Sequence, residues 1–267
     1  MDISNRKAPR TLKDLKEDVR TQLNLGNTAS LNLIEWLAID PLTLLTNILH
    51  SCQRTHYIPE ITTRLEQLKK RTVNTVNETI GITLLQLCQK HRDTSLHSFL
   101  STHVADMARC WAAYMTGLEE SPLSQKMAAI KLFAADTHFG VREIAWMAVR
   151  PSITRELSGS IDILSQWTTD TDAHVRRFAC EVLRPRGVWC AHIDALKTAP
   201  QLALPVLEPL QADPARYVQD SVGNWLNDAS KTQPDFVRNL CAEWEQKSPV
   251  KATQYIIKKA LRTLNKA

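Results

Sequence analysis

Apolar residues recur at intervals of three and four along almost the whole chain, which is the spacing of one face of an α-helix. In the first part this pattern predicts helices over 10–23, 29–38, 41–54, 58–70, 73–91 and 95–116. From residue 121 onward it predicts paired helices: 123–135 with 139–150, 161–168 with 173–184, 192–210 with 215–228, and 235–246 with 250–264. Proline at 200 or 205 should break the range 192–210. The pattern therefore predicts an all-α fold.

A sequence repeat supports the paired arrangement. The segment that begins at Asp136 returns 34 residues later at Asp170, with Asp-Thr, Val-Arg, Ala, an aliphatic residue and Arg-Pro in register. A period of this length is typical of stacked helical pairs. We expect a single domain over 1–267, with irregularly packed helices in 1–120 and plainer pairs in 121–267.

Aspartate in the turn, with Val-Arg early in the second helix, resembles HEAT repeats. In such a solenoid the second helices line the concave face, so the fold predicted here is a HEAT-like α-solenoid with a concave groove. Asp136 and Asp170 are expected to cap the second helices by accepting their free N–H groups. That structural role makes them poor candidates for chemistry.

Polar residues stand where the repeat favours small packing residues. The second helices align on Val141, Val175 and Val218. Two or six residues after these valines lie Glu143, Arg177, Asp220, Glu181 and Asn224. Positions four apart share a helical face, and stacked helices lie roughly 8–10 Å apart, so these side chains should form one polar cluster. Two interpretations remain open: a functional site on the concave face, or salt bridges that fix the register of the helices.

Tryptophans accompany this cluster. The chain has seven tryptophans, concentrated toward its C-terminal half, and we expect two or three of them to lie outside the core. Trp146 is expected to pack, while Trp189 follows a Pro- and Gly-containing connection and is the best candidate for an exposed aromatic platform.

Composition and charge change this picture only modestly. Few glycines and prolines (7 and 12 of 267) agree with helices joined by short turns. The net charge of +5 is weak evidence by itself, but arginines gather in the repeats and the segment after Lys247 has no acidic residue. Arginine suits phosphate oxygens, although charged helix surfaces are also common. The six scattered cysteines are expected to be small buried residues in a reducing cytoplasm.

Several classes of protein are not indicated. The polar N-terminus shows no secretory signal, and no apolar run approaches the roughly 20 residues of a membrane span. Phosphate-binding loops, dinucleotide-binding fingerprints, paired CxxC motifs and HExxH are all missing from the sequence. We therefore expect no metal site and no cofactor.

Three segments together resemble the bacterial DNA alkylation repair proteins of the AlkC/AlkD superfamily, with the AlkC branch closer. They are Asp136 to Glu143, Val175 to Trp189, and Tyr217 to Lys231. The resemblance is best over about residues 136–231. It implies a HEAT-like solenoid that grips double-stranded DNA and cleaves the N-glycosidic bond of cationic bases, 3-methyladenine and, in the AlkC branch, 3-methylcytosine. Some members carry an additional immunoglobulin-like domain, which we do not expect in this protein.

The resemblance also implies roles for individual residues. Glu143 falls at the family's catalytic carboxylate, and Arg177, Glu181 and Trp189 fall at further active-site positions. A cationic base needs no acid to leave, so one carboxylate can stabilise the sugar cation and orient a water. Glu181 is predicted as a second carboxylate that could contact the water. Arg177 would hold a phosphate or fix Glu181, and Trp189 would pack against the nucleotide.

The remaining predicted site residues would contact the DNA backbone, giving affinity that depends on salt and not on sequence. They are Arg142, Arg176, Arg184, Arg186, Asp220, Ser221, Asn224 and Lys231. Asn224 could instead cap a turn. Two other functions remain open: a non-catalytic binder of damaged or branched DNA, and a protein-interaction solenoid. As a DNA repair enzyme the protein would act in the bacterial cytoplasm on the nucleoid, by default as a monomer.

Overall fold

The computed structural model describes residue 3, residues 6–187 and residues 189–266, and in these residues the regular structure is entirely helical. The chain divides into two compact units. The first contains residues 1–120 and 137–148, and the second contains 121–136 and 149–267. Helix α9 (Phe139–Arg155) is shared between the units, because it begins in the first and continues into the second. The prediction of a single domain stays a prediction.

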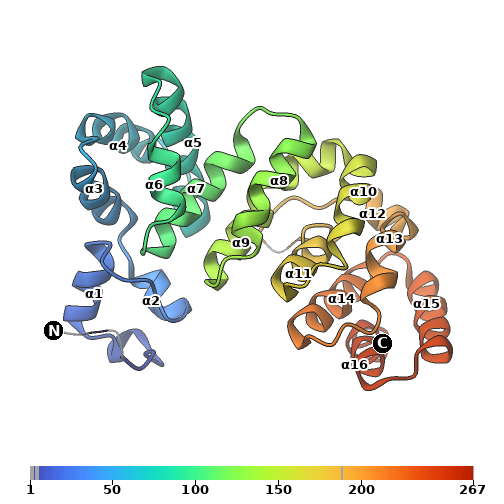
Figure 1. The fold of residues 1–267 in the computed structure, drawn as a ribbon. Helices are drawn as coiled ribbons and strands as arrows, with labels where there is room; N and C mark the ends of the chain where they lie inside the picture. The colour runs from blue at the N-terminus through green and yellow to red at the C-terminus, as the bar shows by residue number, and fades with distance from the viewer. Residues whose placement is uncertain (1–2, 4–5, 188, 267) are drawn as a thin grey trace. The chain divides into compact units, whose positions relative to one another are not determined.

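Among the described residues, the first unit contains seven α-helices besides the start of α9, together with two short 3-10 turns (Figure 1). They are α1 (Glu17–Asn24), α2 (Leu33–Ala38), α3 (Pro41–Ser51), α4 (Ile58–Glu66), α5 (Val73–His91), α6 (Leu96–Ser101) and α7 (Asp106–Leu118), with the 3-10 turns at Leu12–Asp14 and Thr55–Tyr57. Helix α5 packs against both α4 and α7, and α6 packs against α7. Local sequence fixes several starts: Asp40 accepts the N–H of Thr43 at 2.7 Å, directly before Pro41.

The second unit repeats a pairing of helices. Its first helices are α8 (Leu123–Ala134), α10 (Leu157–Trp167), the short α12 (Asp194–Thr198) and α13 (Leu204–Leu207), and α15 (Pro234–Lys247). Its later second helices are α11 (Ala173–Glu181), α14 (Arg216–Ala229) and α16 (Lys251–Ala260). Helix α14 packs between α11 and α16, so these three second helices form one layer (Figure 1). The predicted all-α, HEAT-like class is confirmed.

Most predicted helices exist, and several of them differ in extent. The range 10–23 contains a 3-10 turn and then α1, and 95–116 is divided between α6 and α7. The predicted 139–150 continues past Pro151 to Arg155, and 161–168 starts four residues earlier, at Leu157. The break in 192–210 falls at Pro200, as expected.

Arg109, which follows Ala108 where the later repeats have valine, explains the break between α6 and α7. Arg109 donates to the carbonyl oxygens of His103 and Val104, at 2.7 and 3.0 Å, in the turn before its own helix. Those carbonyls are thereby drawn out of a continuous helix. Arg142 binds the carbonyl of Thr137 in the same way. The repeat therefore extends to α7, where the sequence shows no clear echo.

The predicted capping role of Asp170 is wrong. Asp172 is the N-cap of α11, and its carboxylate accepts the N–H of His174 at 2.8 Å. Asp170 instead accepts the N–H of Asp172 within the turn and pairs with Lys131 at 2.7 Å. Helix α11 begins at Ala173, so Asp172, which directly precedes it, is the residue that caps the helix.

The core holds six of the seven tryptophans. Trp36, Trp111, Trp146, Trp167, Trp225 and Trp244 are each at most 7% exposed. Trp189 is 84% exposed. The packing of Trp146 and the exposure of Trp189 are confirmed, while the expectation of two or three non-core tryptophans is wrong. Burial of large aromatic surfaces contributes most of the stability of such layers.

Candidate functional site

Glu143 lies in the second turn of α9 and is half-buried. Its Oε2 accepts a hydrogen bond from the indole N–H of Trp146 at 2.9 Å. The indole ring is 3% exposed, so a fixed core residue holds the carboxylate in one direction. Glu143 is thus a partly accessible carboxylate with a defined orientation, which is what a catalytic carboxylate requires.

The start of α9 is anchored by a buried polar cluster in the first unit. The hydroxyl of Ser30 donates to Asp106 at 3.0 Å and lies 3.0 Å from Nε2 of His138. Nδ1 of His138 accepts the N–H of Gly140 at 3.1 Å and lies 3.5 Å from Asp106. The cluster fixes the first turn of the helix that carries Glu143.

Glu181 lies in the second unit, at the end of α11, and is 5% exposed. Its Oε1 accepts from Arg184 at 2.9 Å, and its Oε2 accepts from the hydroxyl of Ser221 at 2.6 Å. Arg177 lies 3.6 Å from the same Oε2. Both oxygens are occupied, so the predicted contact with an attacking water is not supported by this geometry.

The charge of Glu181 is compensated inside the unit. Burial would raise the pKa of this carboxyl, but Arg177, Arg184 and the Ser221 hydroxyl together lower it. Arg184 also binds Asp228 through Nε and a terminal nitrogen, at 2.9 and 2.7 Å. Of the two interpretations left open by the sequence, these contacts favour salt bridges that fix the helices for Glu181 and Arg184.

Arg177 has a second neighbour that the sequence reasoning missed. Its guanidinium carbon lies 4.6 Å from the ring centre of Tyr217, in cation–π contact. Tyr217 directly precedes the aligned Val218, so its position in the repeat could have revealed it. Arg177 is 8% exposed, held between Glu181 and this ring.

The side chains of Arg142 and Arg176 bind the turn before their own helices. Arg142 is 8% exposed and donates to the carbonyl of Thr137 at 2.8 Å. Arg176 donates to the carbonyls of Asp170 and Thr171 and forms a two-point ion pair with Asp213 at 2.6 and 3.1 Å. These contacts account for both guanidinium groups structurally. The phosphate contacts predicted for the two arginines stay predictions.

The other predicted backbone-contacting residues lie at varied depths. Ser221 is 2% exposed, and its hydroxyl donates a hydrogen bond to Glu181. Lys231 is exposed and reaches Asp228 at 3.3 Å. Arg186 is half-buried, and among the described residues its buried Nε has no hydrogen-bond partner. Among the described cationic residues predicted to contact the DNA backbone, Lys231 and Arg186 thus keep a charged group in reach of a ligand.

Asp220 and Asn224 face the last helix. Asp220 accepts hydrogen bonds from Tyr255 at 2.6 Å and from Lys259, and Asn224 accepts one from Arg262 at 2.8 Å. Burial would raise the pKa of Asp220, but Lys259 and Tyr255 lower it. Both residues therefore position cations of the C-terminal segment, where Arg262 is exposed.

An exposed cation from α14 joins them. The guanidinium of Arg216 lies over the ring of Tyr255. Arg216 and Arg262 are both exposed, and the sequence reasoning missed them as site residues. The absence of acidic residues after Lys247 was the signal that could have found this basic surface. This surface combines arginine with an aromatic ring, as surfaces that bind nucleic acids often do.

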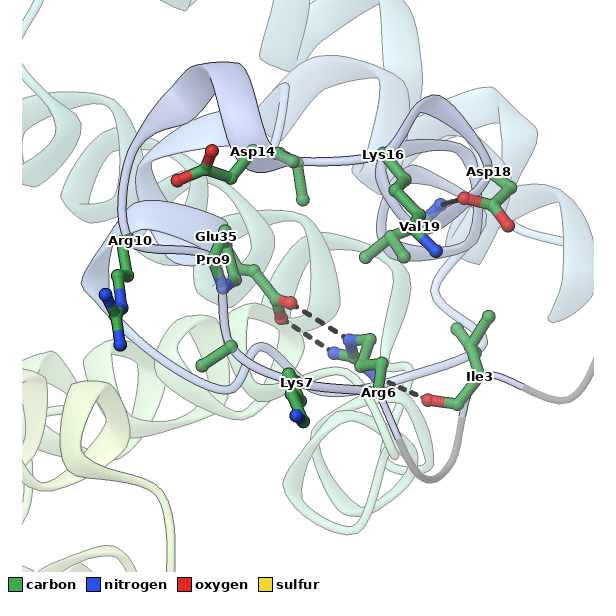
Figure 2. Close-up of a pocket in the computed structure, with 12 residues that line it drawn as sticks. Ile3, Arg6, Lys7, Pro9, Arg10, Asp14, Lys16, Asp18, Val19 and Glu35 are labelled. Carbon is green, nitrogen blue, oxygen red and sulfur yellow. Dashed lines mark hydrogen bonds and ion pairs between the residues drawn. The ribbon is translucent and has the colours of Figure 1, made fainter.

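A pocket at the N-terminus contains none of the predicted site residues. It is lined by residues 3–19 in part and by Glu35, and Figure 2 shows Arg6 gripping both carboxylate oxygens of Glu35. The two bonds measure 3.0 and 2.7 Å, and the side chains are 10% and 1% exposed. This ion pair ties the N-terminal segment to α2, which is a structural role.

The described residues contain no group of three or more His, Cys, Asp or Glu side chains arranged to hold a metal ion. Within the same residues no helix has the length and apolar character needed to cross a bilayer.

Comparison with known proteins finds a family match over the C-terminal part of the chain. Residues 141–264 match the model of the family described as DNA alkylation repair enzyme. The chain is 39% identical over 149 residues to the uncharacterized protein YhaZ of Bacillus subtilis (strain 168), an alignment that covers 56% of this chain and 40% of the relative. The chain thus spans less than half the length of that relative.

Solved structures share the fold. One is the Pseudomonas fluorescens alkylpurine DNA glycosylase AlkC bound to DNA containing an abasic site analog, with a TM-score of 0.69 and 22% identity, over 97% of this chain and 66% of that chain. Another is AlkD2 from Streptococcus mutans, with a TM-score of 0.60 and 21% identity, over 77% of this chain and 98% of that chain.

The fold is of the helical-repeat class, and residues 141–264 are similar in sequence to the DNA alkylation repair enzyme family. The resemblance drawn from three sequence segments is confirmed: residues 141–264 match the DNA alkylation repair enzyme family, and the fold is similar to those of AlkC and AlkD2.

Proposed function

We propose that this protein is a DNA glycosylase that hydrolyses the N-glycosidic bond of cationic alkylated bases in double-stranded DNA, with 3-methyladenine and 3-methylcytosine as candidate substrates. The observation that carries the proposal is the half-exposed carboxylate of Glu143, oriented by the buried indole of Trp146. The family of residues 141–264 and the DNA bound to the similar AlkC support it.

The proposed reaction needs only one carboxylate. The bond between C1′ of the sugar and the base nitrogen breaks, and its electron pair neutralises the positive charge of the base. Glu143 stabilises the cation that develops on the sugar and orients a water molecule. The water oxygen bonds to C1′, and its proton passes to the carboxylate and then to solvent.

Other residues support binding in this proposal. Exposed Trp189 packs its ring against the cationic nucleotide. Arg177 fixes Glu181 in position, which is one of the two roles expected from sequence, and Glu181 makes no contact with the attacking water. Arg216, Arg262, Arg186 and Lys231 supply further phosphate contacts.

Base release decides the proposal. DNA treated with a methylating agent is incubated with the wild-type protein and with Glu143→Gln, and free methylated bases are measured by chromatography. We expect release by the wild-type protein and a loss of about 10²–10³-fold in the variant, with DNA affinity retained. Glu243→Gln, an exposed substitution on α15, serves as the matched control and should release bases normally.

A second candidate function is a non-catalytic binder of damaged or branched DNA. It is favoured by the saturation of Glu181, which leaves Glu143 as the only predicted catalytic carboxylate with an accessible position. Tight DNA binding without any base release by the wild-type protein would establish this alternative and overturn the glycosylase proposal.

A further inference from the structure

The connection that follows α11 presents Trp189 in an unusual state. The side chain is 84% exposed, and the residue has a φ of 67°, in the left-handed region that tryptophan rarely adopts. Such a conformation persists only where the surroundings hold the backbone in place. The contacts that hold it therefore bear on what Trp189 does.

A buried arginine supplies those contacts. Arg150, on α9, is 2% exposed. Its Nε donates to the carbonyl of Ala191 at 3.0 Å, and its terminal nitrogens donate to the carbonyls of Val182 and Arg184. The bonds thus grip the backbone on both sides of Trp189. In the described part of the chain this guanidinium hydrogen-bonds only to main-chain oxygens.

The use of Arg150 differs from that of its repeat equivalent. Arg184, 34 residues later, binds the carboxylates of Glu181 and Asp228. Arg150 remains buried without a carboxylate bonded to it, and burial is the largest cause of its lowered pKa. A buried guanidinium is costly unless its donors are satisfied. The three main-chain carbonyls satisfy the donors of Arg150.

Gly187 shows independently that this connection is packed closely against Arg150. A Cβ placed on Gly187 would lie 2.1 Å from Sγ of Cys190 and 3.2 Å from a terminal nitrogen of Arg150. The backbone N–H of Ile193 also donates to the carbonyl of Pro185 at 3.1 Å, which closes the connection at its base. The backbone around Trp189 is fixed at several points, while its ring is left to solvent.

We propose that Arg150 is a positioning residue: it holds the backbone of the connection after α11 so that the Trp189 ring is presented, preorganised, to the alkylated nucleotide. The inference rests on the proposed function for the identity of the ligand. The presentation of the ring by Arg150 is a property of the free protein and can be measured without any substrate.

The first experiment observes Trp189 directly. The protein is labelled with 5-fluorotryptophan, and its fluorine NMR resonances are recorded, with Trp189→Phe assigning the resonance of interest. We expect Arg150→Gln to shift or broaden the Trp189 resonance, because three main-chain carbonyls lose their donor. Arg150→Lys should not restore it, since one ammonium cannot reach all three carbonyls.

The matched control is Arg54→Gln in the first unit. Arg54 is also a partly buried arginine, paired with Asp93 and bonded to a carbonyl, so its loss reports the general effect of removing such a group. It should leave the Trp189 resonance unchanged. A Trp189 resonance that is identical in the wild-type protein and in folded Arg150→Gln would overturn the proposal.

The second experiment couples the two residues. Arg150→Gln, Trp189→Ala and the double variant are compared in single-turnover release of methylated bases. We expect each single variant to slow release about tenfold and the double variant to be no slower than either. Additive losses would contradict a role of Arg150 through Trp189. If the wild-type protein releases no base, the proposed function fails, and the fluorine resonance still decides the role of Arg150.

Discussion

A single buried carboxylate, Glu181, determines how much of the predicted site is available for chemistry. Its two oxygens are held by Arg184, Ser221 and, more distantly, Arg177, all in the second unit. Removing one partner from a buried ion pair leaves the other charge uncompensated, which is more damaging than loss of the pair itself. Glu181 therefore matters to stability, and through Arg177 to the site.

The first prediction concerns Glu181 and pH. At pH 7, Glu181→Gln should lower the free energy of unfolding by about 3 kcal/mol, measured by urea denaturation. The folded-state pKa of Glu181 lies below its unfolded value of about 4.3, so ionisation stabilises the fold above that pH. The contribution is lost as the pH falls further, toward the folded-state pKa. The difference between variant and wild type should thus shrink at about pH 3.5.

Glu243→Gln provides the comparison. This exposed residue pairs with Lys247 on the surface of α15, and such pairs contribute less than about 1 kcal/mol. An equal effect of the two substitutions, or a Glu181→Gln effect independent of pH, would contradict the role of Glu181 as an ionised partner of buried arginines.

At the scale of the element, the repeat is maintained by a side chain that binds the turn before its own helix. Arg109, Arg142 and Arg176 donate to carbonyls five or six residues earlier. In α14 the amide of Gln219 takes this place and donates to the carbonyl of Asp213 at 2.8 Å. The arginine or glutamine at this position thus helps to end one helix and to start the next.

The second prediction follows for Arg176. Arg176→Ala removes two turn contacts and the ion pair with Asp213, which is 3% exposed at its side chain, so a buried charge is left alone. We expect a loss of about 3 kcal/mol in the free energy of unfolding, with base release per folded molecule retained. Arg238→Ala, at an exposed surface pair, should change stability by less than about 1 kcal/mol. If Arg176→Ala instead lost DNA affinity and kept normal stability, Arg176 would be a residue that contacts a DNA phosphate.

At the scale of the whole molecule, the usable positive charge differs from the formal count. The net charge is +5, but several repeat arginines are engaged internally, and the exposed cations of the second unit include Arg216, Arg262 and Lys231. Association with DNA is expected to depend on the exposed cations, because each phosphate contact releases counterions.

The third prediction tests this distribution. The logarithm of DNA affinity should fall linearly with the logarithm of salt concentration, and Arg216→Gln together with Arg262→Gln should reduce the slope by about two. Arg176→Ala should leave the slope unchanged, because its guanidinium is occupied. Binding titrations with unmodified double-stranded DNA at several salt concentrations give the slopes. An unchanged slope in the double variant would remove these two arginines from the interface.

The sequence by itself determined the helices, the 34-residue register, the burial of Trp146 and the exposure of Trp189. These features follow from local periodicity, from the repeat and from a short Pro- and Gly-containing connection, all of which act over a few residues. The same local reasoning placed Glu143 on a helix face, where the structure finds it half-buried.

Only the tertiary structure decided which charges are available. Arg176 meets Asp213, Glu181 meets Ser221, and Arg184 meets Asp228, at separations of 37, 40 and 44 residues. Arg150 and Arg184 occupy the same position in the repeat yet bind carbonyls in one case and carboxylates in the other. A guanidinium has the same donors in every sequence context, so its partner is set by the backbone and carboxylates that packing brings to it.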